Sequence, residues 1–205
     1  MNLFVDSDHA RDTKTRKSIS CILAALLGVL FDWHMGKQSC IAAHSTDAEV
    51  RAYYTGIHKN KYYRVLCQFL KIPIDQPTTI WEDNQPAIDV MLAGQITGRV
   101  KHMATVIAMI VEDIKAGNNI PKKIKGTINP ADIGTKPLPA STLHRHARQC
   151  RGQRFYPPAN TEHGKLLQVE LVNVQLTEYD HAKASKTIDY RTIDAAAYDN
   201  KEKKK

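Results

Sequence analysis

The chain has no long hydrophobic run and few cysteines. Its longest apolar stretch, residues 21–31, spans eleven residues around Gly28, which is too short to cross a bilayer. The four cysteines contain no Cys-X-X-Cys pair and are too few for a disulfide scaffold in a chain of 205 residues. We therefore expect no membrane association, reduced thiols and an intracellular protein, either cytoplasmic or nuclear.

The remaining composition is that of a folded protein with an excess of positive charge. Hydrophobic residues make up 42% and charged residues 24% of the chain, and the net charge is +8. A basic balance favours a polyanionic partner, although charge alone identifies none. The length leaves room for one domain, which we expect over residues 1–145. An extension follows over 146–176, where the alternation at 169–176 predicts one strand. Residues 177–205 are expected to be a disordered basic tail, because they contain too few large apolar residues to offset the entropy cost of ordering.

Short apolar segments dominate the first forty-four residues and predict strands. The expected strands are residues 2–6, 21–27 and 29–34, with 39–44 as a further candidate. Gly28 and Gly36 are the expected turns between them, so the strands should form an antiparallel meander. Trp33 and Trp81 both lie in strand patterns and are expected in the core.

From residue 45 onward the apolar spacing becomes helical. A helix is predicted over residues 46–72, because Thr46 and Glu49 have the spacing of a capping box. The further expected elements are a strand at 78–82, a helix at 83–92, a helix at 100–115, a strand at 122–128 and a short helix or turn from 131.

Four carboxylates stand at the ends of these expected elements: Asp6, Glu49, Asp83 and Asp132. If the strands pair centrally, the four side chains can converge on one edge of the sheet. Carboxylate oxygens are the ligands that Mg²⁺ prefers. Two such ions about 4 Å apart can stabilise both the attacking and the leaving oxygen in phosphodiester hydrolysis. In a basic protein this combination indicates a nuclease.

Each acid also has an ordinary structural explanation. Asp6 could be a turn residue at a strand end, and Glu49 could serve only in the capping box. Asp83 could cap the following helix, and Asp132 could be an acid favoured by a helix dipole. Spacing alone does not decide between these explanations and a metal site.

Five segments in order carry a more specific signal. They are Phe4-Val5-Asp6-Ser7-Asp8 with Arg16-Lys17-Ser18-Ile19-Ser20, then Ser45-Thr46-Asp47-Ala48-Glu49, Glu82-Asp83-Asn84-Gln85-Pro86-Ala87-Ile88, Arg99-Val100-Lys101-His102 and Ala131-Asp132-Ile133-Gly134-Thr135-Lys136-Pro137-Leu138. Together they cover roughly residues 3–140. In this order the segments resemble the ribonuclease H domain of copia-type LTR retrotransposon Pol polyproteins.

The resemblance implies an α/β fold of the ribonuclease H type: a five-stranded mixed sheet, three antiparallel strands followed by two parallel ones, flanked by helices. It implies an endonuclease that hydrolyses the RNA strand of an RNA–DNA hybrid and leaves 5′-phosphate and 3′-hydroxyl ends. Asp6 would bridge two Mg²⁺ ions, for which Mn²⁺ could substitute. Glu49 and Asp83 would complete the ion on the leaving-group side, and Asp132 would hold the ion that activates water. A reverse transcriptase domain acting in trans is a candidate partner.

Basic and polar residues near these motifs are candidate nucleic-acid contacts. Asn84 and Gln85 are best placed to distinguish a hybrid by its 2′-hydroxyl groups. The expected phosphate contacts are Arg16, Lys17, Arg99, Lys101, His102 and Lys136. A solvated basic face is the ordinary explanation for each of these residues.

Some residues depart from the family pattern or have a weaker claim to a role. Residues 103–106 lack the polar and aromatic pattern usual in that helix, and Gly134 stands where the family has a bulky aromatic residue. Weaker candidates are a metal pair at His144 and His146, a proton shuttle at His44, and Asp8 and Asp47 as alternative carboxylates.

Two other functions remain open. One is a catalytically silent remnant that only binds nucleic acid, which the altered helix favours. The other is the DDE integrase or transposase class, which would need glutamate as its last acid, whereas here glutamate comes second.

Overall fold

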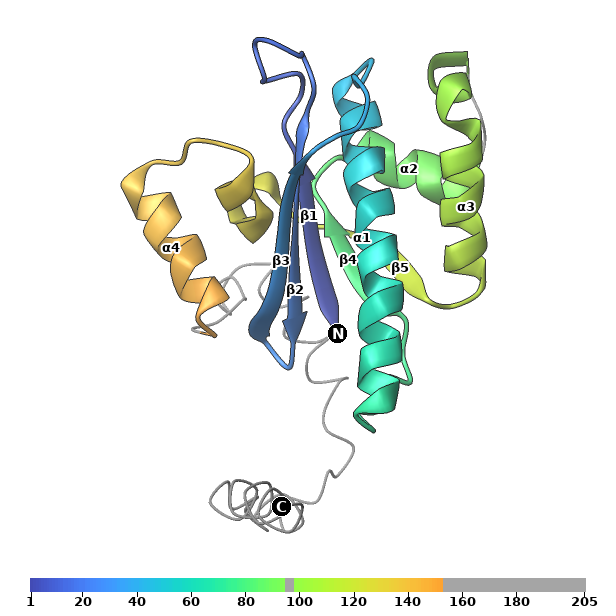
Figure 1. Ribbon diagram of the computed structural model, residues 1–205, viewed down its shortest axis with the longest axis vertical. Helices are drawn as coiled ribbons and strands as arrows, with labels where there is room; N and C mark the ends of the chain where they lie inside the picture. The colour runs from blue at the N-terminus through green and yellow to red at the C-terminus, as the bar shows by residue number, and fades with distance from the viewer. Residues whose placement is uncertain (95–97, 153–205) are drawn as a thin grey trace, which may run out of the picture. The chain divides into compact units, whose positions relative to one another are not determined.

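A computed structural model describes residues 1–94 and 98–152, with side chains given except at 98–100. The strands are β1 (Asn2–Ser7), β2 (Ile19–Leu26), β3 (Val29–Lys37), β4 (Thr78–Glu82) and β5 (Asn119–Lys123). The helices are α1 (Ser45–Phe69), α2 (Gln85–Ala93), α3 (Ala104–Lys115) and α4 (Ala140–Cys150), with short 3₁₀ helices η1 (Gly98–Met103), η2 (Gly126–Ile128) and η3 (Pro130–Gly134) (Figure 1). The strand expected within 169–176 and the tail expected at 177–205 lie outside the described residues.

The five strands form one mixed sheet in the order β3-β2-β1-β4-β5. β3, β2 and β1 pair antiparallel, whereas β4 is parallel to both β1 and β5. This order confirms the ribonuclease H-like fold that the resemblance implied. Because β1 and β4 run side by side in the same direction, their carboxyl ends meet at one edge of the sheet.

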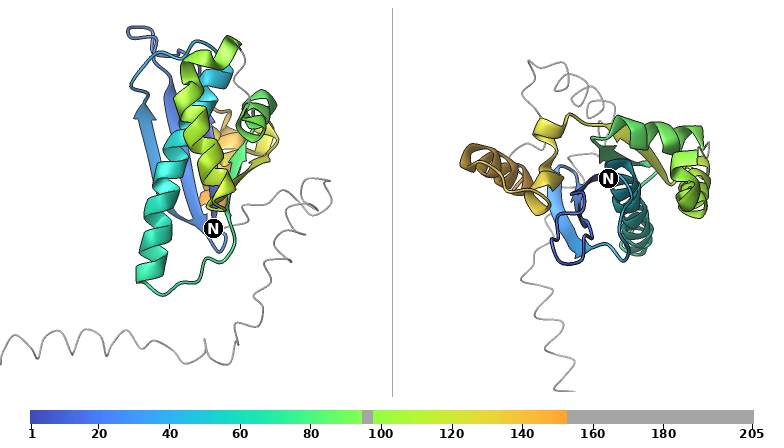
Figure 2. Two further views of the ribbon diagram at one scale, coloured as in Figure 1. Left: turned by 90° about the vertical axis from the view of Figure 1, so that its right-hand side faces the viewer. Right: turned by 90° about the horizontal axis from the view of Figure 1, so that it is seen from above.

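The hydrophobic core lies between one face of the sheet and helices α1, α2 and α3. Leu3, Val5 and Ile80 from the central strands are fully buried against Val50 and Tyr53 of α1. Both views in Figure 2 agree with Figure 1 that α1 lies on one side of the strands and α4 with η3 on the other. In the part of the chain that the structure describes, no helix is both long and apolar enough to span a membrane.

The β2–β3 hairpin confirms one expected turn and contradicts the other. Leu27 and Gly28 both have positive φ angles, 51° and 82°, as a two-residue hairpin turn requires. Gly36 is not a turn, because β3 continues to Lys37 with Gly36 opposite Ser20. Residues 39–44 form no strand. They belong to the loop that connects the end of β3 to the start of α1.

The two tryptophans have opposite environments. Trp81 lies in the core, where its ring stacks on Phe4 and its Nε1 donates a hydrogen bond to Asn2 Oδ1 at 3.1 Å. The expectation for Trp33 was wrong, since 67% of its surface is exposed. Trp33 lies on β3, the end strand of the sheet order, whereas Trp81 lies on β4, which has a strand on each side.

Helix α1 begins without the expected capping box. His44 precedes the helix, and no side chain caps its first turn. The acid in that turn instead supports the preceding loop, because Asp47 Oδ2 accepts a hydrogen bond from the Ala43 N–H at 2.8 Å. Glu49 is therefore not engaged in capping, and its ordinary explanation is removed.

The second half of the fold differs from the expectation at three places. The helix expected at 100–115 starts as η1 and becomes α-helical only at Ala104. The strand expected at 122–128 is β5, which begins three residues earlier than expected. Residues 126–128, expected as the end of that strand, form η2. Helix α4 was not expected, and it crosses the proposed boundary at residue 145, so the division into a domain and an extension stays a prediction.

Candidate metal centre

Three aspartates meet at the shared edge of β1 and β4. Asp6 lies near the end of β1 and is fully buried, and Asp83 follows β4 directly. Asp132 comes from η3, which is held against β1 because Asn129 Nδ2 donates to the Val5 carbonyl at 2.9 Å. One carboxylate oxygen from each of Asp6, Asp83 and Asp132 lies within 4.8 Å of the others. We call these three residues the aspartate group.

A second set of acids adjoins the first. Oxygens of Glu49, Glu82 and Asp83 also lie within 4.8 Å of one another, so Asp83 belongs to both sets. We call Glu49, Glu82 and Asp83 the glutamate group. The sequence interpretation missed Glu82 as a site residue. Alternation along β4 was the available signal, since it places Glu82 on the same face as the core residue Ile80.

The aspartate group carries its own positive charge. Lys136 Nζ lies 3.0 Å from Asp6 Oδ1 and 2.6 Å from Asp132 Oδ1, and the Thr135 hydroxyl donates to the other oxygen of Asp6. Lys136, expected as a phosphate contact, is therefore an ion-pair partner inside the cluster.

The glutamate group has no such partner. Glu82 Oε1 accepts a hydrogen bond from the Asn84 N–H at 2.9 Å. The other oxygens, Oε2 of Glu49 and Oε2 of Glu82, are buried and have no hydrogen-bond partner. Within residues 1–94 and 101–152, and leaving Lys122 aside, no lysine, arginine or histidine side chain forms an ion pair with the carboxylates of this group.

Burial raises the pKa of Asp6, Glu49, Glu82 and Asp83. It raises the pKa of Asp6 to about 7, although the nearby Lys136 ammonium opposes the shift. It also raises the pKa of Glu82 to about 8 and that of Asp83 above its usual range. Burial raises the pKa of Glu49 well above its usual value, and the carboxylates of Glu82 and Asp6 add to the shift. The cluster therefore favours the binding of protons or of cations, which supply positive charge.

The donor set fits a hard divalent cation. Every member of both groups offers a carboxylate oxygen, and two buried oxygens lack a partner. Oxygen-only clusters of this kind suit Mg²⁺ and Mn²⁺ better than metals that prefer nitrogen or sulfur. The arrangement can hold divalent cations; the assignment of Asp6, Glu49, Asp83 and Asp132 as ligands stays a prediction.

Two glycines allow the acids to approach. A Cβ atom on Gly126 would lie 2.8 Å from Asp83 Oδ2, so η2 packs directly against that carboxylate. A Cβ atom on Gly134 would lie 2.5 Å from Cys21 Sγ and 2.7 Å from Met35 Sδ. The bulky residue that the family carries at the position of Gly134 cannot fit here, because Cys21 and Met35 occupy its space.

Asn84 and Gln85 lie directly beside Asp83. Asn84 caps α2, since its Oδ1 accepts a hydrogen bond from the Ala87 N–H at 3.0 Å. The N-cap is therefore Asn84 and not Asp83, which removes the ordinary explanation for Asp83. Gln85 is exposed, and its Nε2 donates to Asp89 Oδ1 at 2.8 Å.

The other expected nucleic-acid contacts lie in two segments. Arg16 is exposed and Lys17 half-buried in the loop between β1 and β2. Lys101 is exposed in η1, where the side chain of Arg99 lies outside the described part. His102 Nε2 lies 3.0 Å from Asp47 Oδ2, which ties η1 to the start of α1. Phosphate contact by these residues stays a prediction.

Asp8 and Asp47 have structural roles. Asp8 Oδ1 accepts a hydrogen bond from the Ile19 N–H at 2.7 Å, and Asp47 Oδ1 pairs with Arg51 at 2.6 Å. His44 is exposed ahead of α1.

The two histidines of α4 do not share an environment. His146 is fully buried and its Nδ1 lies 2.7 Å from Gln149 Oε1, whereas His144 is exposed. Neither belongs to a group of potential metal ligands among the described residues, so the structure does not support the metal pair that was considered as a weak candidate.

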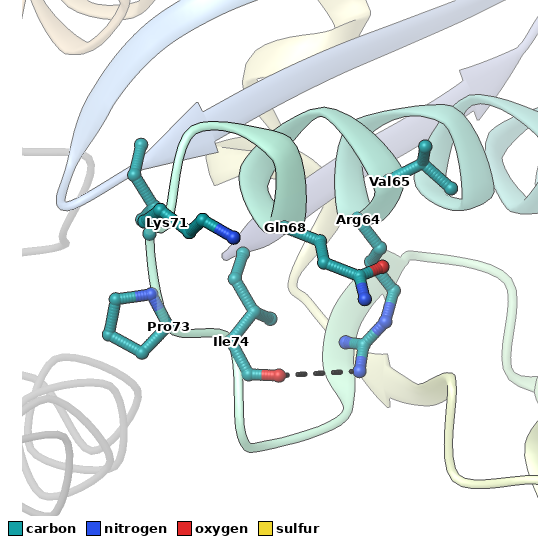
Figure 3. Close-up of a pocket in the computed structure, with 7 residues that line it drawn as sticks. Arg64, Val65, Gln68, Lys71, Pro73 and Ile74 are labelled. Atoms are coloured by element: carbon teal, nitrogen blue, oxygen red, sulfur yellow. Dashed lines mark hydrogen bonds between the residues drawn. The ribbon is translucent and has the colours of Figure 1, made fainter.

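A surface hollow of about 470 Å³ lies at the opposite end of α1 from Glu49 (Figure 3). The guanidinium of Arg64 reaches across it to the carbonyls of Gln76 and Ile74, at 3.1 and 3.4 Å. None of the acids of the aspartate or glutamate group lines this hollow.

Comparison with known proteins gives both sequence relatives and structural likenesses. No family model matches the chain. The retrovirus-related Pol polyprotein from transposon TNT 1-94 of Nicotiana tabacum is 30% identical over 138 residues, which are 66% of this chain and 10% of that polyprotein. The chain thus spans about a tenth of the length of its relative. The resemblance to retrotransposon Pol polyproteins is confirmed.

The structural likenesses are to ribonucleases H and a reverse transcriptase. A crystal structure of LC11-RNase H1 in complex with an RNA/DNA hybrid is 13% identical, with a TM-score of 0.47, and the match covers 65% of this chain and 91% of that one. A prototype foamy virus protease–reverse transcriptase is also 13% identical, with a TM-score of 0.44, and the match covers 76% and 21%. The fold assignment rests on the strand order described above.

Proposed function

We propose that this relative of a retrotransposon Pol polyprotein is a Mg²⁺-dependent endonuclease that hydrolyses the RNA strand of RNA–DNA hybrids. One observation carries the proposal. Carboxylates from residues 6, 49, 83 and 132, far apart in sequence, meet in two adjoining groups at one edge of the sheet. The order of the five motifs and the net charge of +8 support it.

The chemistry assigned to the site follows from its two groups. Two bound divalent ions, Mg²⁺ or Mn²⁺, would act as Lewis acids on the attacking and leaving oxygens of the scissile phosphate. Asp6 and Asp132 would hold the ion beside the attacking water, and Glu49 and Asp83 the ion beside the leaving oxygen. The resemblance implied Asp6 as the bridging ligand, whereas Asp83 is the member that both groups share.

The substrate would be held by residues around this edge. Exposed cations such as Arg16 and Lys101 would contact phosphates, and each contact would make binding weaker at high salt. Gln85 is better suited than Asn84 to meet a 2′-hydroxyl group, because the Asn84 side chain already caps α2. A reverse transcriptase domain in trans could add substrate affinity. A cytoplasmic or nuclear location stays a prediction.

A cleavage assay on a labelled RNA–DNA hybrid tests the function. We expect cleavage of the RNA strand in Mg²⁺ or Mn²⁺ and none in EDTA, with duplex DNA left intact. A chain that binds the hybrid but does not cleave it in either metal would contradict the proposal. That result would favour the alternative of a catalytically silent nucleic-acid-binding remnant.

A further inference from the structure

The two carboxylate groups differ in how their negative charge is balanced. In the aspartate group, the ammonium of Lys136 contacts both Asp6 and Asp132. In the glutamate group, no cationic side chain of the described residues forms an ion pair with Glu49 or Glu82. Among the described residues, Glu49 and Glu82 therefore lack a cationic side chain that would balance their charge by an ion pair.

The glutamate group also contains buried carboxylate oxygens that accept no hydrogen bond. Glu82 is fully buried and Glu49 is 6% exposed, yet Oε2 of each lacks a hydrogen-bond partner. A buried carboxylate oxygen without a partner is unfavourable, and a metal ion is one of the few ligands that satisfies several such oxygens at once.

The position of Glu82 is fixed by its surroundings. It is the last residue of β4 and pairs in register with Lys123 of β5. Its carbonyl accepts a hydrogen bond from the Ile124 N–H at 2.9 Å, and its Oε1 accepts one from the Asn84 N–H at the same distance. The side chain is thus held in place, while its Oε2 atom has no hydrogen-bond partner.

We propose that Glu82 is a ligand of a divalent cation, which it binds together with Glu49 and Asp83. An oxygen of each residue lies within 4.8 Å of the others, and all three are hard carboxylate donors that suit Mg²⁺ or Mn²⁺. This inference rests on the proposed function and deepens it, because it adds a fifth carboxylate to the four that the sequence indicated.

The competing explanation is that Glu82 is a buried neutral acid with a purely structural role. Glu82→Gln separates the two explanations. The amide oxygen can keep the hydrogen bond from Asn84, and the amide resembles a protonated acid in size and charge. A structural Glu82 would tolerate this change with no effect on metal binding.

The test measures Mn²⁺ binding to the full chain in the absence of nucleic acid, from the electron paramagnetic resonance signal of free Mn²⁺. We expect two bound equivalents in the wild type. E82Q should lose one equivalent or bind it more weakly by at least the ~10–100-fold that loss of an outer-shell partner costs. E112Q, which changes an exposed acid on α3, should match the wild type. D132N should weaken the other equivalent.

Circular dichroism checks the fold of each variant, and E82D, which keeps the charge but shortens the side chain, serves if E82Q does not fold. Wild-type binding by both Glu82 variants would overturn the inference. So would a wild-type chain that binds a single equivalent and loses it in D132N, a result that needs no Glu82 variant.

The two proposals fail in distinguishable ways. If the Glu82 variants lose an equivalent but no hybrid is cleaved, the inference stands and the proposed function fails. If the hybrid is cleaved while these variants bind Mn²⁺ as the wild type does, the inference fails and the function stands.

Discussion

The aspartate and glutamate groups share Asp83 but differ in how the negative charge of their buried carboxylates is balanced. In the aspartate group, Lys136 and Thr135 satisfy the buried Asp6 from within the chain. In the glutamate group, Glu49 and Glu82 each keep a buried oxygen without a partner. Lys136 thus balances part of the charge of the first group, whereas Glu49 and Glu82 of the second group have no ion-pair partner among the described residues. Variants can therefore test the two groups separately.

The largest expected effect comes from the residue that both groups share. Asp83→Asn should lower the rate of hybrid cleavage about 10³-fold or more, equivalent to about 4 kcal/mol of transition-state stabilisation. Hybrid affinity, measured by fluorescence anisotropy, should change little because the basic contacts remain. Asp75→Asn, an exposed acid in the loop after α1, is the matched control and should cleave normally. Undiminished cleavage by Asp83→Asn would remove the proposed site.

The next effect is the pH dependence of the metal-free protein. The folded-state pKa of Asp6 is about 7 against an ordinary 3.8, so the folded chain binds this proton more tightly than the unfolded chain. The free energy of unfolding should therefore fall as the pH rises from about 4 to about 7, and Glu82 should extend the fall to about 8. Each pKa unit corresponds to about 1.4 kcal/mol. Urea unfolding in EDTA between pH 5 and pH 8 measures the slope.

Mg²⁺ should flatten this slope, because a bound cation replaces the proton as the source of positive charge. Stability in EDTA that instead increases across the same pH range would contradict the charge balance described for both groups.

A smaller effect should follow from Gly126→Ala. The new methyl group would meet Asp83 Oδ2 at 2.8 Å and turn that carboxylate aside, at little cost to the fold because only a side-chain end must move. We expect cleavage to fall roughly 10- to 100-fold, as small misplacements of reacting groups do, with a nearly unchanged melting temperature.

Gly117→Ala is the control for that variant. Gly117 has a φ of 72° and no atom near its Cβ position, so alanine there should cost about 1–2 kcal/mol of stability and leave cleavage intact. If the two variants lost activity and stability in parallel, the contact between Gly126 and Asp83 would not be the cause.

The smallest effect is expected from Lys136→Met, which acts on the aspartate group alone. The metal-free protein should lose about 1–2 kcal/mol, because Asp6 stays buried without its cation while the half-exposed lysine limits the loss. Addition of Mg²⁺ should then raise the melting temperature more than in the wild type. Lys125→Met, at an exposed lysine, is the control. An equal Mg²⁺ response in the wild type and Lys136→Met would contradict the role of Lys136 as a built-in counter-ion.

The sequence predicted the sheet and its acids where local patterns were sufficient. Short strand patterns at residues 2–6 and 78–82 placed Asp6 and Asp83 at strand ends, and the order of motifs implied the sheet that makes these strands neighbours. Lys136 was interpreted as a phosphate contact because nothing local links it to Asp6, which is 130 positions away. Glu82 was missed because a charged residue on a buried face contradicts the hydrophobic pattern that identifies such faces.

Two other differences have separate causes. Helix α4 was overlooked although its apolar residues Ala140, Leu143, Ala147 and Cys150 recur at helical spacing, and the residues that it buries are the polar His146 and Gln149. Trp33 was placed in the core because a strand pattern does not reveal which strand will stand at the end of the sheet. The order of five strands depends on contacts between distant segments.

The close approach of Gly134 to Cys21 and Met35 ties η3 to β2, the neighbour of β1, and to the end strand β3. Two sulfur atoms set how near η3 can come to β2 and β3, and η3 carries Asp132. The position of Asp132 relative to the other acids therefore depends partly on side chains outside both carboxylate groups. A larger residue at position 134 would therefore require smaller side chains at positions 21 and 35, or a shift of η3 and with it Asp132.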